Sequence, residues 1–271
     1  MKDNKTHEIH LKNEMETLLI TLYAKALDNR SKNPILNDVK AEELLGRIDY
    51  DFEKLKGFGN EIMVIRAKQF DMWLNEFLET NPNSIVLNLG CGLDTRISRI
   101  NPPSTVNWFD LDFPDVIELR KLFYSNQEGY QMISSSVTEF NWLEQLPRDK
   151  PVMILAEGIL EYLTEDDVQE LLNRLTHHFS NGQIAFDVMN AFAINSGKKN
   201  LKETTGAEHK WVVDNIQDVD QLNVNLKRIA MQSIFKSKYI HKLPLNSRLI
   251  YAVLCILPSF KNMMRLLLYK F

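Results

Sequence analysis

Cysteine is scarce in this chain of 271 residues, which contains only Cys91 and Cys255. There is no CxxC pair and no cluster of Cys with His, so we expect neither a disulfide framework nor a metal site. Two isolated thiols are typical of a reducing cytoplasm, where we place the protein. Long apolar runs are missing too: no stretch of about 18 apolar residues occurs and residues 1–10 are polar, so the sequence predicts neither a transmembrane helix nor a signal peptide.

An excess of charge of either sign is also missing. The 32 Lys and Arg residues face 36 Asp and Glu residues, a net charge of −4. No global positive field would gather a polyanion, so we expect no nucleic-acid partner. The most apolar segments, 249–257 and 263–269, are separated by Pro258 and Lys261. For them we favour a docked C-terminal helix and strand over a membrane-surface role, and we expect no membrane partner.

What the sequence does contain, from residue 84 onward, is an alternation of short β-branched or aromatic runs with helical patterns. The runs predict strands at 84–89, 105–110, 131–134, 152–156 and 183–189. Strands separated by helices predict a parallel sheet of the α/β class with helices on both faces. No repeat or Gly/Ser linker marks a boundary, and 44% hydrophobic residues suffice for one core, so the whole chain is predicted to be a single domain.

Two helices stand out from the pattern. One follows Thr164, a good N-cap ahead of three acidic residues, and carries apolar residues at helical spacing up to Phe179. The other is amphipathic, spans about residues 62–78 and ends near Pro82. The helix after Thr164 is predicted to cover one face of the sheet.

The two ends of the chain are predicted to flank the sheet. Residues 12–50 look helical with a break at Asn33-Pro34, which predicts a helical lid within residues 1–60. The core would then occupy residues 61–190. Residues 191–271 would form an acceptor-pocket insertion and C-terminal elements, for which the pattern predicts a polar loop at 196–208, a strand at 228–235 and a helix at 245–257.

The strongest sign of a ligand site is a strand that runs into Gly90-Cys91-Gly92. Glycine lets the backbone approach a ligand closely, and ligands of parallel sheets bind at the carboxyl ends of the strands. The next strand leads to Asp112, which could accept hydrogen bonds from both hydroxyls of a ribose, and Gly90 lies 22 residues before it, close to the roughly 20 of dinucleotide-type sites. Two alternatives stay open: Asp112 caps the following helix, or Asp110 is the ribose ligand.

Phosphorylated nucleotides fit this turn poorly. A pyrophosphate turn has a third glycine where this chain has Thr95, and no nucleoside-triphosphate P-loop motif occurs. Asp94 would repel phosphates but can engage an ammonium group. A cationic sulfonium with an adenosine and an amino-acid tail therefore fits better.

Arg66 lies on the apolar stripe of its predicted helix, four residues after Ile62 and four before Phe70. A buried guanidinium needs a partner, because an unpaired buried charge is very costly. The carboxylate of a methionine tail would be a suitable bidentate partner. An internal salt bridge to Asp94 or Glu157 is an equal alternative.

Glu157 directly follows the predicted strand 152–156, so it should lie at the same edge of the sheet. From there it could contact the cationic part of the ligand or shape the acceptor pocket. As an alternative, it could cap a helix that starts near Gly158.

Three motifs in this order, N-L-G-C-G-L-D-T-R (88–96), W-F-D-L-D-F-P-D-V-I (108–117) and A-E-G-I-L-E-Y-L (156–163), resemble the leucine carboxyl methyltransferase family. Within it the chain is similar to the tetracenomycin polyketide O-methyltransferase-like branch. The resemblance runs from about Leu18 to Asp187 and thins beyond Ala193. It implies a Rossmann-like class I methyltransferase fold with a seven-stranded, mostly parallel sheet, and S-adenosyl-L-methionine as cofactor.

The resemblance also implies residue roles. Arg66 would hold the methionine carboxylate, Asp112 the ribose, and Ser136 with Val137 would flank the adenine. Asn88 stands where many methyltransferases carry an acid, and Ser136 where better-known members carry an aspartate. With the turn and the glutamate near the cofactor, the predicted cofactor-binding residues are Arg66, Gly90, Cys91, Gly92, Asp94, Asp112, Ser136, Val137 and Glu157.

The predicted function is transfer of a methyl group to a carboxyl or hydroxyl oxygen of a small molecule, such as a polyketide-like metabolite. A hydroxyl acceptor needs a general base and a carboxylate does not. His209 and His241 could serve, but we expect both to be exposed and assign no catalytic residue. Tyr23 and Lys25 of the lid are expected at the acceptor pocket. Two alternatives stay open: a protein C-terminal carboxyl methyltransferase, and a catalytically inactive cofactor-binding partner protein.

Overall fold

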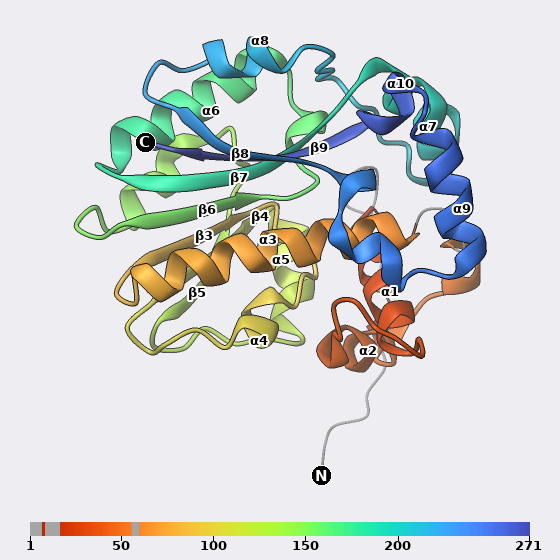
Figure 1. Ribbon diagram of the computed structural model, residues 1–271. Coiled ribbons are helices and arrows are strands. Elements are labelled where there is room, and N and C mark those ends of the chain that lie inside the picture. The colour runs from red at the N-terminus through yellow and green to blue at the C-terminus, as the bar shows by residue number, and fades with distance from the viewer. Residues whose placement is uncertain (1–6, 9–16, 56–59) are drawn as a thin grey trace.

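A seven-stranded sheet runs through the computed structural model, which describes residues 7–8, 17–55 and 60–271. The strand order is β5-β4-β3-β6-β7-β9-β8, and helices lie on both faces of the sheet (Figure 1). Strands β5, β4, β3, β6 and β7 pair in parallel, whereas β9 is antiparallel to β7 and β8. The Rossmann-like α/β fold with a mostly parallel sheet is confirmed.

The parallel strands lie close to their predicted positions. Every residue of β3 and β6 is buried, as expected for central strands that helices cover on both sides. Strand β4 is shifted by two residues from the predicted 105–110, so Asp112 is its last residue and pairs with Ser134. The strands of the sheet are β3 (Ile85–Leu89), β4 (Asn107–Asp112), β5 (Tyr130–Ser134), β6 (Val152–Ala156), β7 (Gly182–Met189), β8 (Lys227–Ser233) and β9 (Met264–Lys270).

Alternate strand residues face the two predicted helices. Helix α3 (Asn60–Thr80) covers one face, where Val86 and Trp108 join its side chains in one apolar cluster. Helix α6 (Glu165–His178) covers the other face, where Leu87 lies in a second cluster with Leu171. Thr164 caps α6 through a reciprocal pair of contacts with Asp167, so the predicted start is confirmed.

Helices α1 (Thr17–Asn29) and α2 (Val39–Leu45), with the 3-10 turn η2 (Phe52–Leu55), form a third apolar cluster against α5 (Pro114–Lys121). The predicted break near Asn33-Pro34 is present: Asp28 accepts hydrogen bonds from the backbone of the residues that follow it. A two-residue strand pair, β1 (His7–Glu8) and β2 (Ile48–Asp49), lies beside the helices. Residues 12–16 of the predicted helical region lie outside the described residues.

The predicted loop at 196–208 is wrong, because helix α7 spans Ala191–Thr205. Asn190 caps its start, Gly206 ends it in the left-handed conformation, and Ala193 and Ile194 anchor it in the core, so its polar residues only mark an exposed face. The predicted C-terminal strand and helix are present as β8 and α9. The other elements are α4 (Arg96–Ile100), η3 (Phe140–Gln145), η4 (Leu160–Tyr162), α8 (Ile216–Gln221), η5 (Ile234–Lys236), η6 (Lys238–Lys242), α9 (Leu245–Leu254) and α10 (Pro258–Lys261).

Candidate functional site

The carboxyl ends of β3, β4, β5 and β6 surround a cavity of about 300 Å³, which α1 borders on its other side. This volume is within the range of small-molecule sites. The sequence-predicted residues come together here, because all nine line the cavity: Arg66, Gly90, Cys91, Gly92, Asp94, Asp112, Ser136, Val137 and Glu157.

The turn after β3 requires its two glycines. Gly90 and Gly92 have φ of 60° and 49°, where L side chains are strained. A Cβ at Gly90 would lie 2.5 Å from Ile159 Cδ1, and one at Gly92 would lie 3.1 Å from Leu18 Cβ. Cys91 between them is buried, and burial raises the pKa of its thiol well above the usual value. The backbone of the turn, rather than the thiol, is therefore the surface offered to a ligand.

Asp112 closes the other side of this turn. One carboxylate oxygen accepts a hydrogen bond from Gly92 N at 2.7 Å, and the other accepts one from Phe113 N at 2.7 Å. Burial raises the pKa of Asp112 to about 6, although these two hydrogen bonds oppose the rise. Helix α5 has Phe113 as its N-cap with no side-chain cap, so the alternative that Asp112 caps this helix is wrong.

Asp110, the alternative ribose ligand, does not line the cavity. It is fully buried and accepts hydrogen bonds from Asn88, Trp108 and Tyr130 at 2.7 to 3.0 Å. It also forms an ion pair of 2.5 Å with Arg120. Four donors leave its carboxylate committed to the protein, so the assignment of Asp110 to a ligand is wrong.

Arg120 links that buried carboxylate to the turn. Its Nη1 donates to Gly92 O at 3.0 Å and to Asp94 O at 2.7 Å, while Nη2 pairs with Asp110. Sequence analysis missed this residue. The signal that found Arg66 could have found it, since Arg120 follows the buried Val116 by four residues on the inner face of α5.

Arg66 reaches the cavity from α3 and is paired inside the protein. Its Nε donates to Glu157 at 3.1 Å and its Nη1 to Asp187 at 2.9 Å. The internal salt bridge to Glu157 is therefore present and the one to Asp94 is not. Gly158, at φ 70°, leaves space for the guanidinium, because a Cβ there would lie 2.7 Å from Nη2. Burial disfavours the charged form of Arg66, but the nearby carboxylates outweigh this effect and raise its pKa above the usual value.

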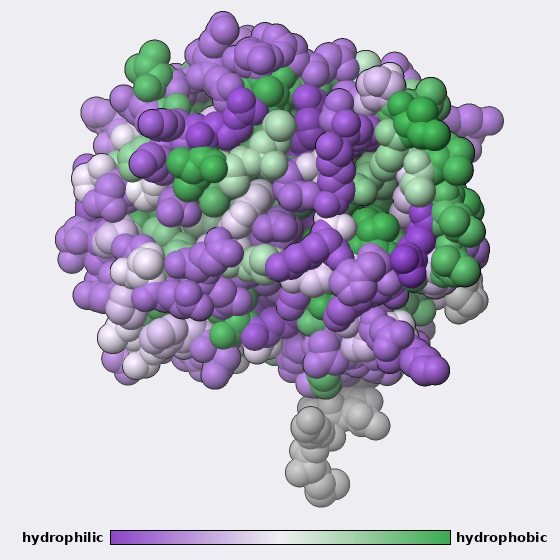
Figure 2. Space-filling model, in the orientation of Figure 1, coloured by the Kyte–Doolittle hydropathy of each residue, from purple (hydrophilic) through white to green (hydrophobic). Residues whose placement is uncertain are grey.

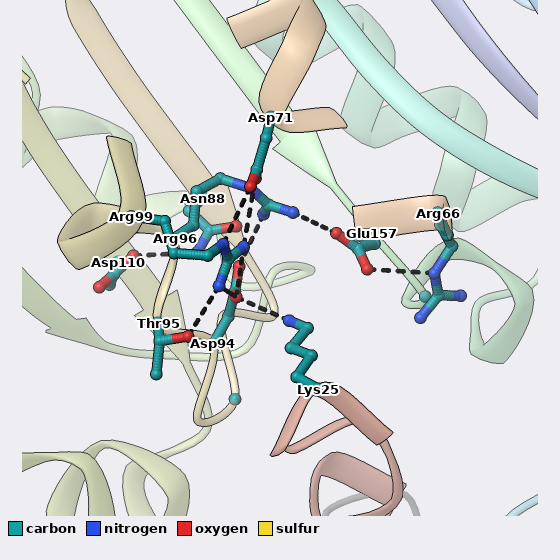
Figure 3. A network of polar contacts seen from close by, with 12 residues as sticks. Lys25, Arg66, Asp71, Asn88, Asp94, Thr95, Arg96, Arg99, Asp110 and Glu157 are labelled. Carbon is teal, nitrogen blue, oxygen red and sulfur yellow. Dashed lines mark hydrogen bonds and ion pairs between the residues drawn. The ribbon is translucent and has the colours of Figure 1, made fainter. Parts of the chain in front are cut away.

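Glu157 joins Arg66 to a larger network (Figure 3). Its second oxygen accepts a short hydrogen bond from Arg96, which also donates to Asp71 at 2.7 Å. Burial would raise the pKa of Glu157, but Arg96 and Arg66 lower it, so the carboxylate stays ionised. The following turn η4 has Ile159 as its N-cap, so the alternative that Glu157 caps a helix is wrong.

Asp94 pairs with three cations of this network. It accepts from Lys25 at 2.7 Å and forms ion pairs with Arg96 at 2.7 Å and Arg99 at 3.2 Å. Burial would raise the pKa of Asp94, but these three cations lower it well below its usual value. Figure 3 shows Lys25 reaching from the lid toward Asp94, so the lid and the turn are joined by a buried ion pair. The ammonium partner of Asp94 in this structure belongs to the protein itself.

Ser136 and Val137 form the cavity wall after β5. Val137 is buried, and Ser136 Oγ lies 2.9 Å from Thr138 Oγ1. An apolar side chain beside a small hydroxyl suits the edge and face of a planar ring.

The two histidines differ. His241 is exposed on η6, as expected, and does not line the cavity. His209 is half-buried, so the expectation of exposure is wrong for it: its ring lies 5.0 Å from that of Tyr162, a cavity residue. Burial lowers the pKa of His209, which favours a neutral imidazole.

Tyr23, expected at the acceptor pocket, stacks on Phe52 in the lid cluster instead. Among the described residues no group of three or more Cys, His, Asp and Glu side chains could hold a metal ion.

A family profile matches a large part of this chain. The sequence profile of leucine carboxyl methyltransferases matches residues 18–176, more than half of the chain. The chain belongs to the leucine carboxyl methyltransferase family. This family member is therefore an S-adenosyl-L-methionine-dependent O-methyltransferase, and S-adenosyl-L-methionine is its cofactor.

Two relatives support the assignment. This leucine carboxyl methyltransferase is similar to the tetracenomycin polyketide synthesis O-methyltransferase TcmP of Streptomyces glaucescens, with 38% identity over 266 residues, 97% of this chain and 98% of that protein. It is also similar to an S-adenosyl-L-methionine-dependent methyltransferase of Gibberella zeae, with 33% identity over 229 residues, 76% of this chain and 77% of that protein. The predicted branch is thereby confirmed.

Solved structures show the same fold. A candidate methyltransferase of Thermobifida fusca has a TM-score of 0.62 at 12% identity, covering 99% of this chain and 96% of its own. A DUF574 family protein of Streptomyces avermitilis has a TM-score of 0.60 at 10% identity, covering 96% of this chain and 97% of its own.

Proposed function

We propose that this O-methyltransferase methylates a carboxyl or hydroxyl oxygen of a small molecule of the polyketide-like class. The observation that carries the proposal is the cavity itself, a small space between the sheet edge and the lid helix α1. The relative at 38% identity, named for tetracenomycin polyketide synthesis, supports this acceptor class. The experiment must distinguish this reaction from the alternative, methyl transfer to the C-terminal carboxyl group of a protein.

Five of the nine predicted residues, Arg66, Asp112, Ser136, Val137 and Glu157, fit direct roles toward the cofactor. Both oxygens of Asp112 accept a backbone hydrogen bond and could also accept from ribose hydroxyls, while Val137 and Ser136 would flank the adenine. The amino-acid tail of the cofactor carries a carboxylate and an ammonium group. Two residues of the cavity wall could bind them: Arg66 the carboxylate and Glu157 the ammonium. S-adenosyl-L-methionine supplies a methyl group activated by a positive sulfur. The chain contributes alignment and exclusion of water.

The lid and the C-terminal region would complete the acceptor pocket within a single domain over residues 1–271. From the lid, Thr17, Leu18, Thr21 and Lys25 line the cavity, which supports a covering role for α1. From residues 191–271 only Lys210 does so among the described residues. The acceptor would therefore enter between α1 and the segment that carries Lys210.

His209 is the candidate base for a hydroxyl acceptor. It does not itself line the cavity, but it is adjacent to Lys210 and contacts Tyr162, which do, and its buried Nδ1 has no hydrogen-bond partner among the described residues. A neutral imidazole there could take a proton from a hydroxyl. Replacement by Gln should then lower kcat by about 100-fold or more for a phenolic acceptor and leave a carboxylate acceptor unaffected.

The test is to incubate the protein with methyl-labelled S-adenosyl-L-methionine and three sets of acceptors: aromatic carboxylic acids, polyphenols, and peptides that end in leucine. Mass spectrometry of each mixture would identify the methylated oxygen. Methyl ester or ether formation on a small molecule is the expected result. Methylation of the peptides alone would refute the proposed acceptor class.

A further inference from the structure

Helix α9 presents an apolar face outward rather than inward. Leu245, Leu249 and Val253 recur every four residues along α9, and Ile256 and Leu257 follow just after its end at Leu254; all five are 57% to 77% exposed. They form one stripe, here called the α9 stripe. Its opposite side is held in the core, where Tyr251 is 1% exposed. Figure 2 shows hydrophobic side chains gathered over α9 at the right of the molecule. A helix with an apolar outer face indicates a binding surface.

The charge around the α9 stripe has a single sign. Residues 221–271 contain nine of the 32 Lys and Arg residues and none of the 36 Asp and Glu residues. Lys236, Lys238, Lys242 and Arg248 are exposed, and none of them forms an ion pair within the described part of the chain. Contact with the neighbouring ammonium of Lys261 lowers the pKa of Lys236, a sign of crowded positive charge.

We infer that the α9 stripe and its flanking cations dock on an anionic lipid surface. This revises our expectation of no membrane partner, which rested on the shortness of the apolar segments. The described residues contain no helix that could cross a membrane, but an interfacial helix needs only one apolar face and nearby cations for acidic headgroups.

Two other occupants fit less well. A second copy bound about a twofold axis would place the same cations opposite one another, with no carboxylate from residues 221–271 to pair them. An acidic protein would match the cations but would need a surface shaped to a convex single helix. A lipid surface satisfies both features without shape complementarity, because acyl chains adapt to the side chains that enter them.

The location of the stripe relates to the reaction. Helices α9 and α1 lie at the side of the molecule where the parallel strands end (Figure 1). Lys242 of η6 donates to Pro34 O in the lid at 3.0 Å, which ties the C-terminal region to the lid. Docking through α9 would hold the cavity near a lipid phase in which an apolar acceptor dissolves.

Co-sedimentation of the full-length protein with two kinds of vesicle tests the proposal. One kind is pure phosphatidylcholine. The other contains about 30% phosphatidylglycerol, which gives it a negative surface charge similar to that of an anionic leaflet. We expect the protein to bind the anionic vesicles, and we expect this binding to weaken when the salt concentration is raised to about 0.5 M. The double variant Leu249→Asp/Val253→Asp should reduce partitioning by about tenfold or more, and Lys238→Gln/Arg248→Gln by about fivefold or more.

Val224→Asp is the matched control, because Val224 is 96% exposed in the loop between α8 and β8. It introduces the same kind of charge and should leave partitioning unchanged. Circular dichroism of each variant checks that the fold is retained. Absence of vesicle binding by the wild-type protein, equal loss in the control, or a dimer in sedimentation equilibrium that only the α9 variant dissociates would overturn the proposal. Binding only to an acidic protein in place of lipid would do so too.

Discussion

Lowering the pH from 7 to 5 is expected to weaken the binding of S-adenosylhomocysteine by about tenfold, through one carboxyl group. The pKa of Asp112 is raised to about 6 by burial. If the bound ribose requires the carboxylate, the ligand lowers this pKa, so affinity is nearly full at pH 7 and above and is lost as the pH falls through 6. At pH 5 only about one molecule in eleven holds the ionised form, which corresponds to about 1.4 kcal/mol.

Calorimetric titration at pH 5, 6, 7 and 8 would measure this dependence. Asp112→Asn is the matched variant: it removes the titration and should give a nearly flat profile with affinity about 1.5 to 3 kcal/mol weaker at pH 7. Any titration of the ligand itself is shared by both proteins. A wild-type affinity that does not change between pH 5 and 7, or a variant with the same pH dependence, would remove Asp112 from the ribose site.

The stability of the ligand-free protein gives a control with the opposite sign. Because the folded Asp112 carboxyl holds its proton more tightly than an unfolded one, its contribution to stability falls as the pH rises from about 4 to about 6. The Asn variant lacks this loss, but its amide can accept from only one of Gly92 N and Phe113 N, so its melting temperature at pH 7 should fall only slightly below that of the wild type. A large drop in melting temperature would show that the variant loses affinity because its turn at Gly92 is disrupted, and not because a ribose contact is lost.

Three further substitutions test the contacts around the cavity. Arg66→Leu leaves Glu157 and Asp187 without their shared cation, so we expect a loss of about 3 to 5 kcal/mol in the free energy of unfolding by denaturant titration; an unchanged stability with weaker cofactor binding would contradict the structural pairing. Gly90→Ala forces a side chain into φ 60° against Ile159 and should abolish measurable cofactor binding in calorimetry. Asn190→Ala removes the cap of α7 and should cost about 1 kcal/mol in thermal unfolding, with cofactor affinity retained.

The sheet could be predicted because its strands are short apolar runs with polar residues at their ends. Strand β6 lies at the predicted residues 152–156, and every one of its side chains is buried. The prediction failed for α7, whose fifteen residues include a long polar segment. Composition marked that segment as a loop, whereas the cap at Asn190 and the left-handed Gly206 define a helix with an exposed polar face. Polarity reports exposure, and it does not separate a loop from the outer side of a helix.

The cavity wall could be predicted as a set of residues but not as a set of contacts. Parallel strands place their carboxyl ends together, so Gly90 and Asp112 were expected side by side, and Gly92 N bonds to that carboxylate. The partners of Arg66 could not be chosen in the same way. Asp187 is 121 residues away along the chain, and spacing offers no means of selecting one carboxylate among several at the same edge.

The pairing of Arg66 with Glu157 does not exclude either residue from the cofactor site. The tail of the cofactor is a zwitterion, so it brings one charge of each sign and leaves the total charge of the wall unchanged. A carboxylate approaching Arg66 and an ammonium approaching Glu157 could exchange partners with the internal pair, and no charge would be left buried alone. A single-charged ligand would lack this exchange. An analogue of S-adenosylhomocysteine without its amino group should therefore lose more affinity than one hydrogen bond provides, about 2 to 5 kcal/mol. A loss near 1 kcal/mol, typical of one neutral hydrogen bond, would place the amino group away from Glu157.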